Sequence, residues 1–68
     1  PANTSSGDTY LAEAIQLANQ GMHSEAISAA NRAVAAFNRS IEANVNVDAS
    51  KRGIANANRL ISHWRQSL

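Results

Sequence analysis

The apolar residues between His23 and Val45 fall into two stripes, and within each stripe the members recur every three or four residues. The stripe with the larger side chains is Ile27, Ala30, Val34, Phe37 and Ile41. The stripe with the smaller side chains is Ala29, Ala33, Ala36, Ser40 and Ala43. A helix with one apolar stripe covers one side of a core. A helix with two stripes must therefore face two neighbours, or one neighbour in this chain and one outside it.

The segments on either side of this helix have the same helical spacing. The apolar stripe of the first segment is Leu11, Ala14, Ile15 and Ala18. That of the last segment is Ile54, Ala57, Ile61, Trp64 and Leu68. Together with the central segment they predict three helices, over about residues 9–20, 23–44 and 49–67. Because Trp64 falls on an inner stripe, we expect it to anchor the core.

Residues that favour turns mark the ends of these helices. Gly21 follows the first helix, where a residue without a Cβ adopts the left-handed conformation that closes a helix. The second helix restarts almost at once, so the first two must form an antiparallel hairpin. Asp8 and Asp48 are candidate N-caps of the first and third helices. Gly53, inside the third helix, predicts a close approach of a neighbouring helix.

Three amphipathic helices with short connections predict an all-α fold, a three-helix up-down-up antiparallel bundle. A chain of 68 residues forms one small domain at most. We assign the bundle to residues 8–68 and expect residues 1–7 to form a flexible N-terminal lead. Apolar and polar residues nowhere alternate for long enough to predict a strand.

The composition indicates the cellular compartment of the protein more than its function. The chain has no cysteine, which fits a reducing intracellular compartment, and we expect a cytoplasmic location. A formal net charge of +1 gives no reason to expect a nucleic-acid partner. No apolar run approaches the roughly 20 residues that span a bilayer, so we expect no transmembrane helix. The N-terminal residues lack the basic and apolar regions of a signal peptide.

The sequence contains no catalytic or metal-binding motif. Its acidic residues are scattered, and no serine stands in a nucleophile-elbow setting. His23 and His63 are far apart in the chain, and neither has a carboxylate at metal-ligand spacing. We therefore expect no enzymatic activity, no metal ion and no cofactor.

The first hairpin carries the signature of a known repeat. A turn glycine, Gly21, is followed by Glu25-Ala26-Ile27 and then by Ala33-Val34. This pattern resembles the helix-turn-helix of tetratricopeptide repeats. One such hairpin followed by a third helix resembles a MIT (microtubule interacting and trafficking) domain, over about residues 10–68. The matching positions are Gly21, Glu25, Ala26, Ile27, Ala33, Val34, Phe37, Ile41, Asp48, Lys51 and Ile54.

The resemblance implies a binding module. Such domains dock a short helix or extended peptide, typically from the tails of ESCRT filament subunits, in a groove beside the third helix. They recruit their parent protein to trafficking or membrane-remodelling sites, endosomes among them. The family's third helix usually carries acidic residues near its end, which pair with basic groups of the peptide. The charged residues near and along this chain's third helix are instead mainly basic: Lys51, Arg52, Arg59 and Arg65.

The candidate partner-binding residues lie on the second and third helices. The small stripe has two interpretations. Either part of it forms the floor of a groove for a partner helix, or it packs the third helix closely against the second. Leu60 is either a wall of the same groove or the edge of the core. The candidate contact residues are Ala29, Ala33, Ala36, Ser40, Asn56, Leu60 and His63.

Two further hypotheses stay open. The small stripe is a seam for self-association, in which case the domain is structural. Alternatively, the arginine pairs Arg32/Arg39 and Arg52/Arg59, each seven residues apart, bind an anionic surface or nucleic acid. Sedimentation distinguishes self-association, which gives a dimer, from peptide docking by a monomer. The salt dependence of binding identifies an anionic surface or nucleic acid as the partner.

Overall fold

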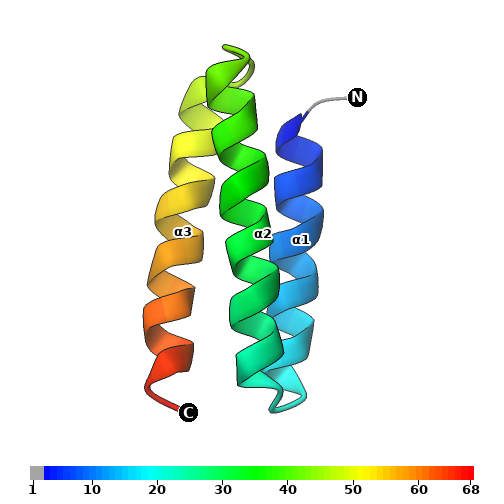
Figure 1. The fold of residues 1–68 in the computed structure, drawn as a ribbon, viewed down its shortest axis with the longest axis vertical. Coiled ribbons are helices and arrows are strands. Elements are labelled where there is room, and N and C mark those ends of the chain that lie inside the picture. Colours follow the sequence, from blue (N-terminus) through cyan, green and yellow to red (C-terminus); the bar gives the residue numbers. More distant parts are fainter. Residues whose placement is uncertain (1–2) are drawn as a thin grey trace.

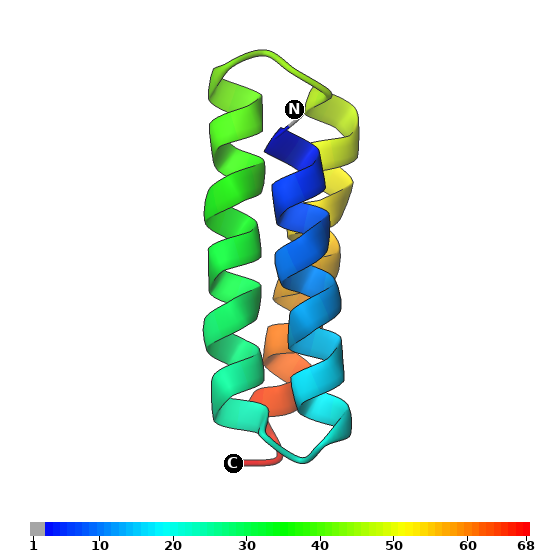
Figure 2. The same ribbon diagram turned by 90° about the vertical axis from the view of Figure 1, so that its right-hand side faces the viewer.

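The computed structural model describes residues 3–68, which form three helices joined by short turns. They are α1 (Asn3–Asn19), α2 (His23–Glu42) and α3 (Val47–Arg65). The chain runs up, down and up, as predicted, and α2 stands between α1 and α3 in Figure 1. Figure 2, turned by 90°, shows α2 set to one side of the other two helices. The two views together place α2 at the apex of a triangle whose base is α1 and α3.

The first turn closes α1 as the sequence predicts. Gly21 has φ +82°, in the left-handed region. The Met22 N–H donates to the Leu17 carbonyl (2.9 Å), and the Gly21 N–H donates to the Ala18 carbonyl (3.0 Å). This pair of bonds is a Schellman motif, which satisfies carbonyls that the end of the helix would otherwise leave free. The turn is short enough to bring α2 back along α1.

The second turn uses asparagine where the first uses glycine. Asn44 has φ 59°, and the Val45 N–H donates to the Ser40 carbonyl (2.9 Å). The α2 helix therefore ends at Glu42 rather than near residue 44. The N-cap position of α3 is Asn46, so the prediction that Asp48 caps this helix is wrong. Asp48 lies in the first turn instead, where its negative charge interacts favourably with the positive end of the helix dipole.

The first helix begins earlier than its composition suggests. It starts at Asn3, so Asp8 lies inside the helix and is not its cap. Residues 3–7, expected to belong to a flexible lead, are helical, and residues 1–2 of that lead lie outside the described part of the chain. The reason is tertiary: Gly7 is buried in the bundle. A contact with another helix outweighs the low helix propensity of glycine.

The central helix buries its small residues. It packs along both α1 and α3, so it has two neighbouring helices within this chain. The small stripe is buried from Ala29 to Ser40, whereas Ile27, Val34 and Ile41 of the large stripe are only half-buried. Small side chains let two helix backbones approach α2 at once. The largest side chains of α2, Phe37 excepted, therefore lie at the edge of the contact.

Phe37 fills the space between the outer helices. Its ring is 1% exposed. A Cβ placed on Gly7 of α1 would lie 2.5 Å from Phe37 Cε1, and one placed on Gly53 of α3 would lie 2.5 Å from Phe37 Cζ. The tip of the ring therefore lies against two glycine backbones, one from each neighbouring helix. The close approach predicted at Gly53 is confirmed, and α2 supplies the side chain.

The rest of the core lies at the other end of the bundle. Trp64 and Ile61 of α3 pack with Ala14 of α1 and with alanines of α2. Trp64 is 5% exposed, so its predicted place in the core is confirmed.

Two serine hydroxyl groups in the described part of the chain are buried between the helices. Ser40 of α2 and Ser50 of α3 have no exposed surface, and their Oγ atoms have no hydrogen-bond partner. Ser40 lies three residues after Phe37, and Ser50 lies three residues before Gly53. Since Phe37 and Gly53 meet across an antiparallel pair, the two serines fall at the same level of the bundle.

Candidate functional site

The bundle is open along one side, between α1 and α3. These two helices contact each other much less than either contacts α2. A groove with a volume of about 410 Å³ lies between them. Its lining residues are Leu11, Ile15, Asn56, Arg59 and Leu60.

The floor of the groove is apolar. Leu11 and Ile15 follow one another by a turn on α1, and Leu60 faces them from α3. Leu11 and Leu60 are half-buried, whereas Ile15 is 42% exposed. Each of these residues stands beside a buried position, Ala14 or Ile61, so the groove is the outer edge of the core.

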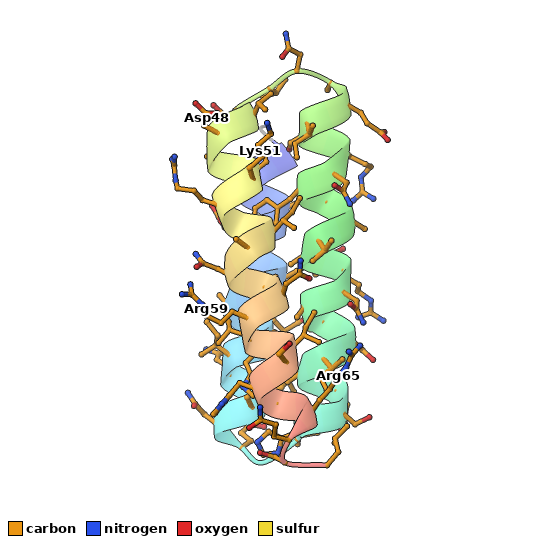
Figure 3. All side chains as sticks on the ribbon, turned by 90° about the vertical axis from the view of Figure 1, so that its left-hand side faces the viewer. Asp48, Lys51, Arg59 and Arg65 are labelled. Atoms are coloured by element: carbon orange, nitrogen blue, oxygen red, sulfur yellow. The ribbon has the colours of Figure 1, made fainter. Side chains whose placement is uncertain are left out.

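The rim on the α3 side is polar. The Arg59 guanidinium donates to Asn56 Oδ1, one turn earlier on the same helix, and both residues are exposed. This bond holds the charged group beside the groove. Figure 3 shows Arg59 on the edge of α3 that lies toward α1, with Lys51 and Arg65 toward α2. Arg59 thus stands on a different side of the helix from Lys51 and Arg65.

Charge is distributed unevenly among the helices. Four basic residues and one acidic residue give α3 a net charge of +3, with histidine neutral. The α1 helix carries Asp8 and Glu13 and no basic residue, for a net charge of −2. In α2 two arginines balance two glutamates. The groove therefore has a basic wall and a weakly acidic wall, but no carboxylate is among its lining residues.

The predicted contact residues divide into two sets. Asn56 and Leu60 line the groove, and His63 is exposed on the next turn of α3 without lining it. The α2 residues, by contrast, have at most 1% exposed surface, so a partner has nothing to touch there in this fold. They are Ala29, Ala33, Ala36 and Ser40. The small stripe therefore packs the helices against one another, the alternative to a groove floor in the sequence analysis.

Sequence reasoning missed the α1 wall. Leu11 and Ile15 were assigned to the inner stripe of the first helix, and only their position relative to α3 shows that they border an open side. A signal was present in the sequence. At 100° per residue, Ile15 falls at one edge of its stripe, with Ala14 at the other edge and with Leu11 and Ala18 between them.

The described residues contain no group of three or more histidine, cysteine, aspartate or glutamate side chains placed to hold a metal ion. Over the same residues, no helix has both the length and the apolar character needed to cross a membrane.

Comparison with known proteins gives no family assignment: the chain matches no protein-family model, no curated protein and no solved structure at a significant level.

Proposed function

We propose that this chain is a non-catalytic interaction module that docks a short peptide segment in the groove between α1 and α3. The observation that carries the proposal is the apolar floor of that groove, above all Ile15, which keeps 42% of its surface exposed. Concave apolar surfaces with a few polar groups at the rim are the usual form of a ligand site. Here Leu11, Ile15 and Leu60 supply the floor, and Asn56 with Arg59 supplies the rim.

The size of the groove favours a short segment over a folded partner. A stable interface between folded proteins buries about 800 Å² on each side. That is close to one fifth of the 4206 Å² of accessible surface on this chain. A groove lined by five residues is much smaller. It fits two or three side chains of a helix or an extended strand, as in helix-in-groove recognition.

The resemblance to MIT domains supports the same function. Gly21 closes α1 as the tetratricopeptide-like hairpin requires, and α3 follows that hairpin in the same antiparallel order. We infer a divergent MIT-like domain that binds tails of ESCRT type. In that case the module recruits its parent protein to trafficking or membrane-remodelling machinery, at endosomes, from the cytoplasm.

The proposal is tested by changing the floor of the groove. A library of random 16-residue peptides displayed on phage is selected on the immobilised chain, and the enriched peptides are titrated in solution. We expect Ile15→Ser to weaken their binding about tenfold, since it removes most of a buried aliphatic contact. Val45→Ser is the matched control, because Val45 is 38% exposed but lies in the turn after α2. Equal effects of the two changes would contradict the groove assignment.

Self-association is the competing function. The exposed Ile15 could pack against a second copy of the chain instead of a peptide. Sedimentation at micromolar concentration distinguishes the two: we expect a monomer. A stable dimer that Ile15→Ser converts to monomer would replace peptide docking by oligomerisation.

A further inference from the structure

We propose that the segment bound in this groove is acidic: two or three apolar residues seated between α1 and α3, with a carboxylate beside them on Arg59. The inference rests on the proposed function, and it specifies the chemistry of the partner. It follows from the charges that border the groove and from the way Arg59 is held.

The groove contains one uncompensated charge. Arg59 is the only charged residue that lines it among the residues the structure describes, and the other polar lining residue is the neutral Asn56. On α1, Asp8 precedes Leu11 by three residues and lies on the same side of the helix toward its N-terminal end. Glu13 lies two residues from both Leu11 and Ile15, so it points away from the groove. On α3, Asp48 lies on the same edge of the helix as Arg59 in Figure 3, but it is eleven residues, or about three turns, away along the axis.

The α3 wall adds a second cation. Arg52 is exposed and precedes Arg59 by seven residues, or about two turns, so both lie along the same side of the helix. Lys51 and Arg65 lie toward α2 (Figure 3). A bound segment that runs along α3 therefore passes Arg59 first and Arg52 two turns further on, about 10 Å away along the axis. Asp48, four residues before Arg52, and Asp8, at the same level on α1, offset the charge of Arg52, so Arg59 is the cation that a carboxylate of the bound segment would meet.

Arg59 is prepared to accept a carboxylate. A guanidinium has five N–H donors, and the bond to Asn56 Oδ1 occupies one of them. The remaining donors keep the planar fork that binds a carboxylate with two parallel hydrogen bonds. A basic ligand would instead be repelled by Arg59 at the rim, because no carboxylate lines the groove to attract it.

The test begins with the composition of the selected peptides. We expect the phage-displayed library to yield peptides in which aspartate or glutamate flanks a pair of apolar residues. Peptides that depend on Ile15 but are rich in lysine or arginine would overturn the acidic inference and leave the groove function standing. A selection that yields no peptide sensitive to Ile15→Ser would overturn the groove function itself, and this inference with it.

A charge swap then tests the contact directly. Arg59→Glu should weaken the best acidic peptide about tenfold, and changing the key carboxylate of the peptide to lysine should restore its binding to that variant. Arg65→Glu is the matched control, because it makes the same change in net charge on the side of α3 toward α2. Both arginines are exposed, so circular dichroism should show an unchanged helix content in both variants.

The control also separates a specific contact from general attraction to anions. If Arg59→Glu and Arg65→Glu weaken the peptide equally, overall positive charge attracts the ligand and the proposal is wrong. Vesicles containing phosphatidylserine and a short DNA duplex are measured with the same two variants. Binding to either that exceeds peptide binding and depends on Arg59 alone would assign the site to an anionic surface or to nucleic acid instead of an acidic peptide.

Discussion

Replacing Gly53 by alanine should destabilise the bundle, although the same change inside an isolated helix would stabilise it. Alanine has the higher helix propensity by about 1 kcal/mol. In the structure, however, the new Cβ would lie 2.5, 2.6 and 2.8 Å from three atoms of the Phe37 ring. The ring is 1% exposed, and it cannot retreat toward α1 because its tip already lies against Gly7.

The expected magnitude follows from these two opposing effects. Extra carbon in a well-packed core costs about 1–3 kcal/mol, and this site belongs in the upper half of that range because the ring is held on both sides. After the gain in propensity is subtracted, we expect a net loss of about 1–2 kcal/mol in the free energy of unfolding. For a domain of this size each kcal/mol shifts the melting temperature by about 4–8 °C. Urea and thermal unfolding followed by circular dichroism measure both quantities.

A double-mutant cycle isolates the contact between Gly53 and the ring. Phe37→Leu removes the atoms that the new Cβ would meet, so its own cost should be smaller with alanine at position 53 than with glycine. In that background we expect Gly53→Ala to be neutral or stabilising by up to about 1 kcal/mol. The reasoning is refuted if Gly53→Ala stabilises the chain while Phe37 is present, or if the two backgrounds give the same change.

Three further predictions concern other features of the bundle and are checked by urea unfolding. Ser40→Ala and Ser50→Ala should each raise the free energy of unfolding by up to about 1 kcal/mol, since each removes a buried hydroxyl that has no hydrogen-bond partner. A decrease of more than about 1 kcal/mol would show instead that a buried water satisfies these hydroxyl groups. Gly21→Ala should lower the free energy of unfolding by about 1 kcal/mol. The cause is the positive φ of this residue alone, because nothing lies within 4 Å of the added Cβ. Gly21→Asn should lower it by less, since asparagine tolerates the left-handed conformation better. Trp64→Ala should cost about 3–5 kcal/mol, and a change below 1 kcal/mol would exclude Trp64 as a core anchor.

Local signals predicted the order of the elements but not all of their limits. Gly21 and the apolar periodicity are properties of neighbouring residues, so they predicted the hairpin and the three helices. The start of α1 depends on Gly7 meeting Phe37, which is thirty residues further along the chain. No local pattern contains that contact. The composition of residues 3–7 therefore indicated a flexible lead where the structure has a helix.

The candidate site was predicted on one wall only. The flank of the third helix, with Asn56 and Leu60, was identified from its spacing, and both residues line the groove. The small stripe of α2 was ambiguous, because alanines at helical spacing serve equally for packing or for a groove floor. The angle at which α1 and α3 cross α2 decides between these roles, and that angle is not encoded in the periodicity of a single helix. Here it buries Ala33 and exposes Ile15 instead.

The pairing of helices also has a kinetic consequence. Each outer helix packs chiefly on the helix next to it in the chain, so most native contacts can form after closing only a short loop. Proteins with such low contact order fold in microseconds to milliseconds. At one end of the bundle, Phe37 makes its contacts only when both hairpins are in place, since it meets Gly7 and Gly53 together. We therefore expect the insertion of its ring, together with the packing of Trp64 at the other end, to join the two hairpins into one cooperative unit.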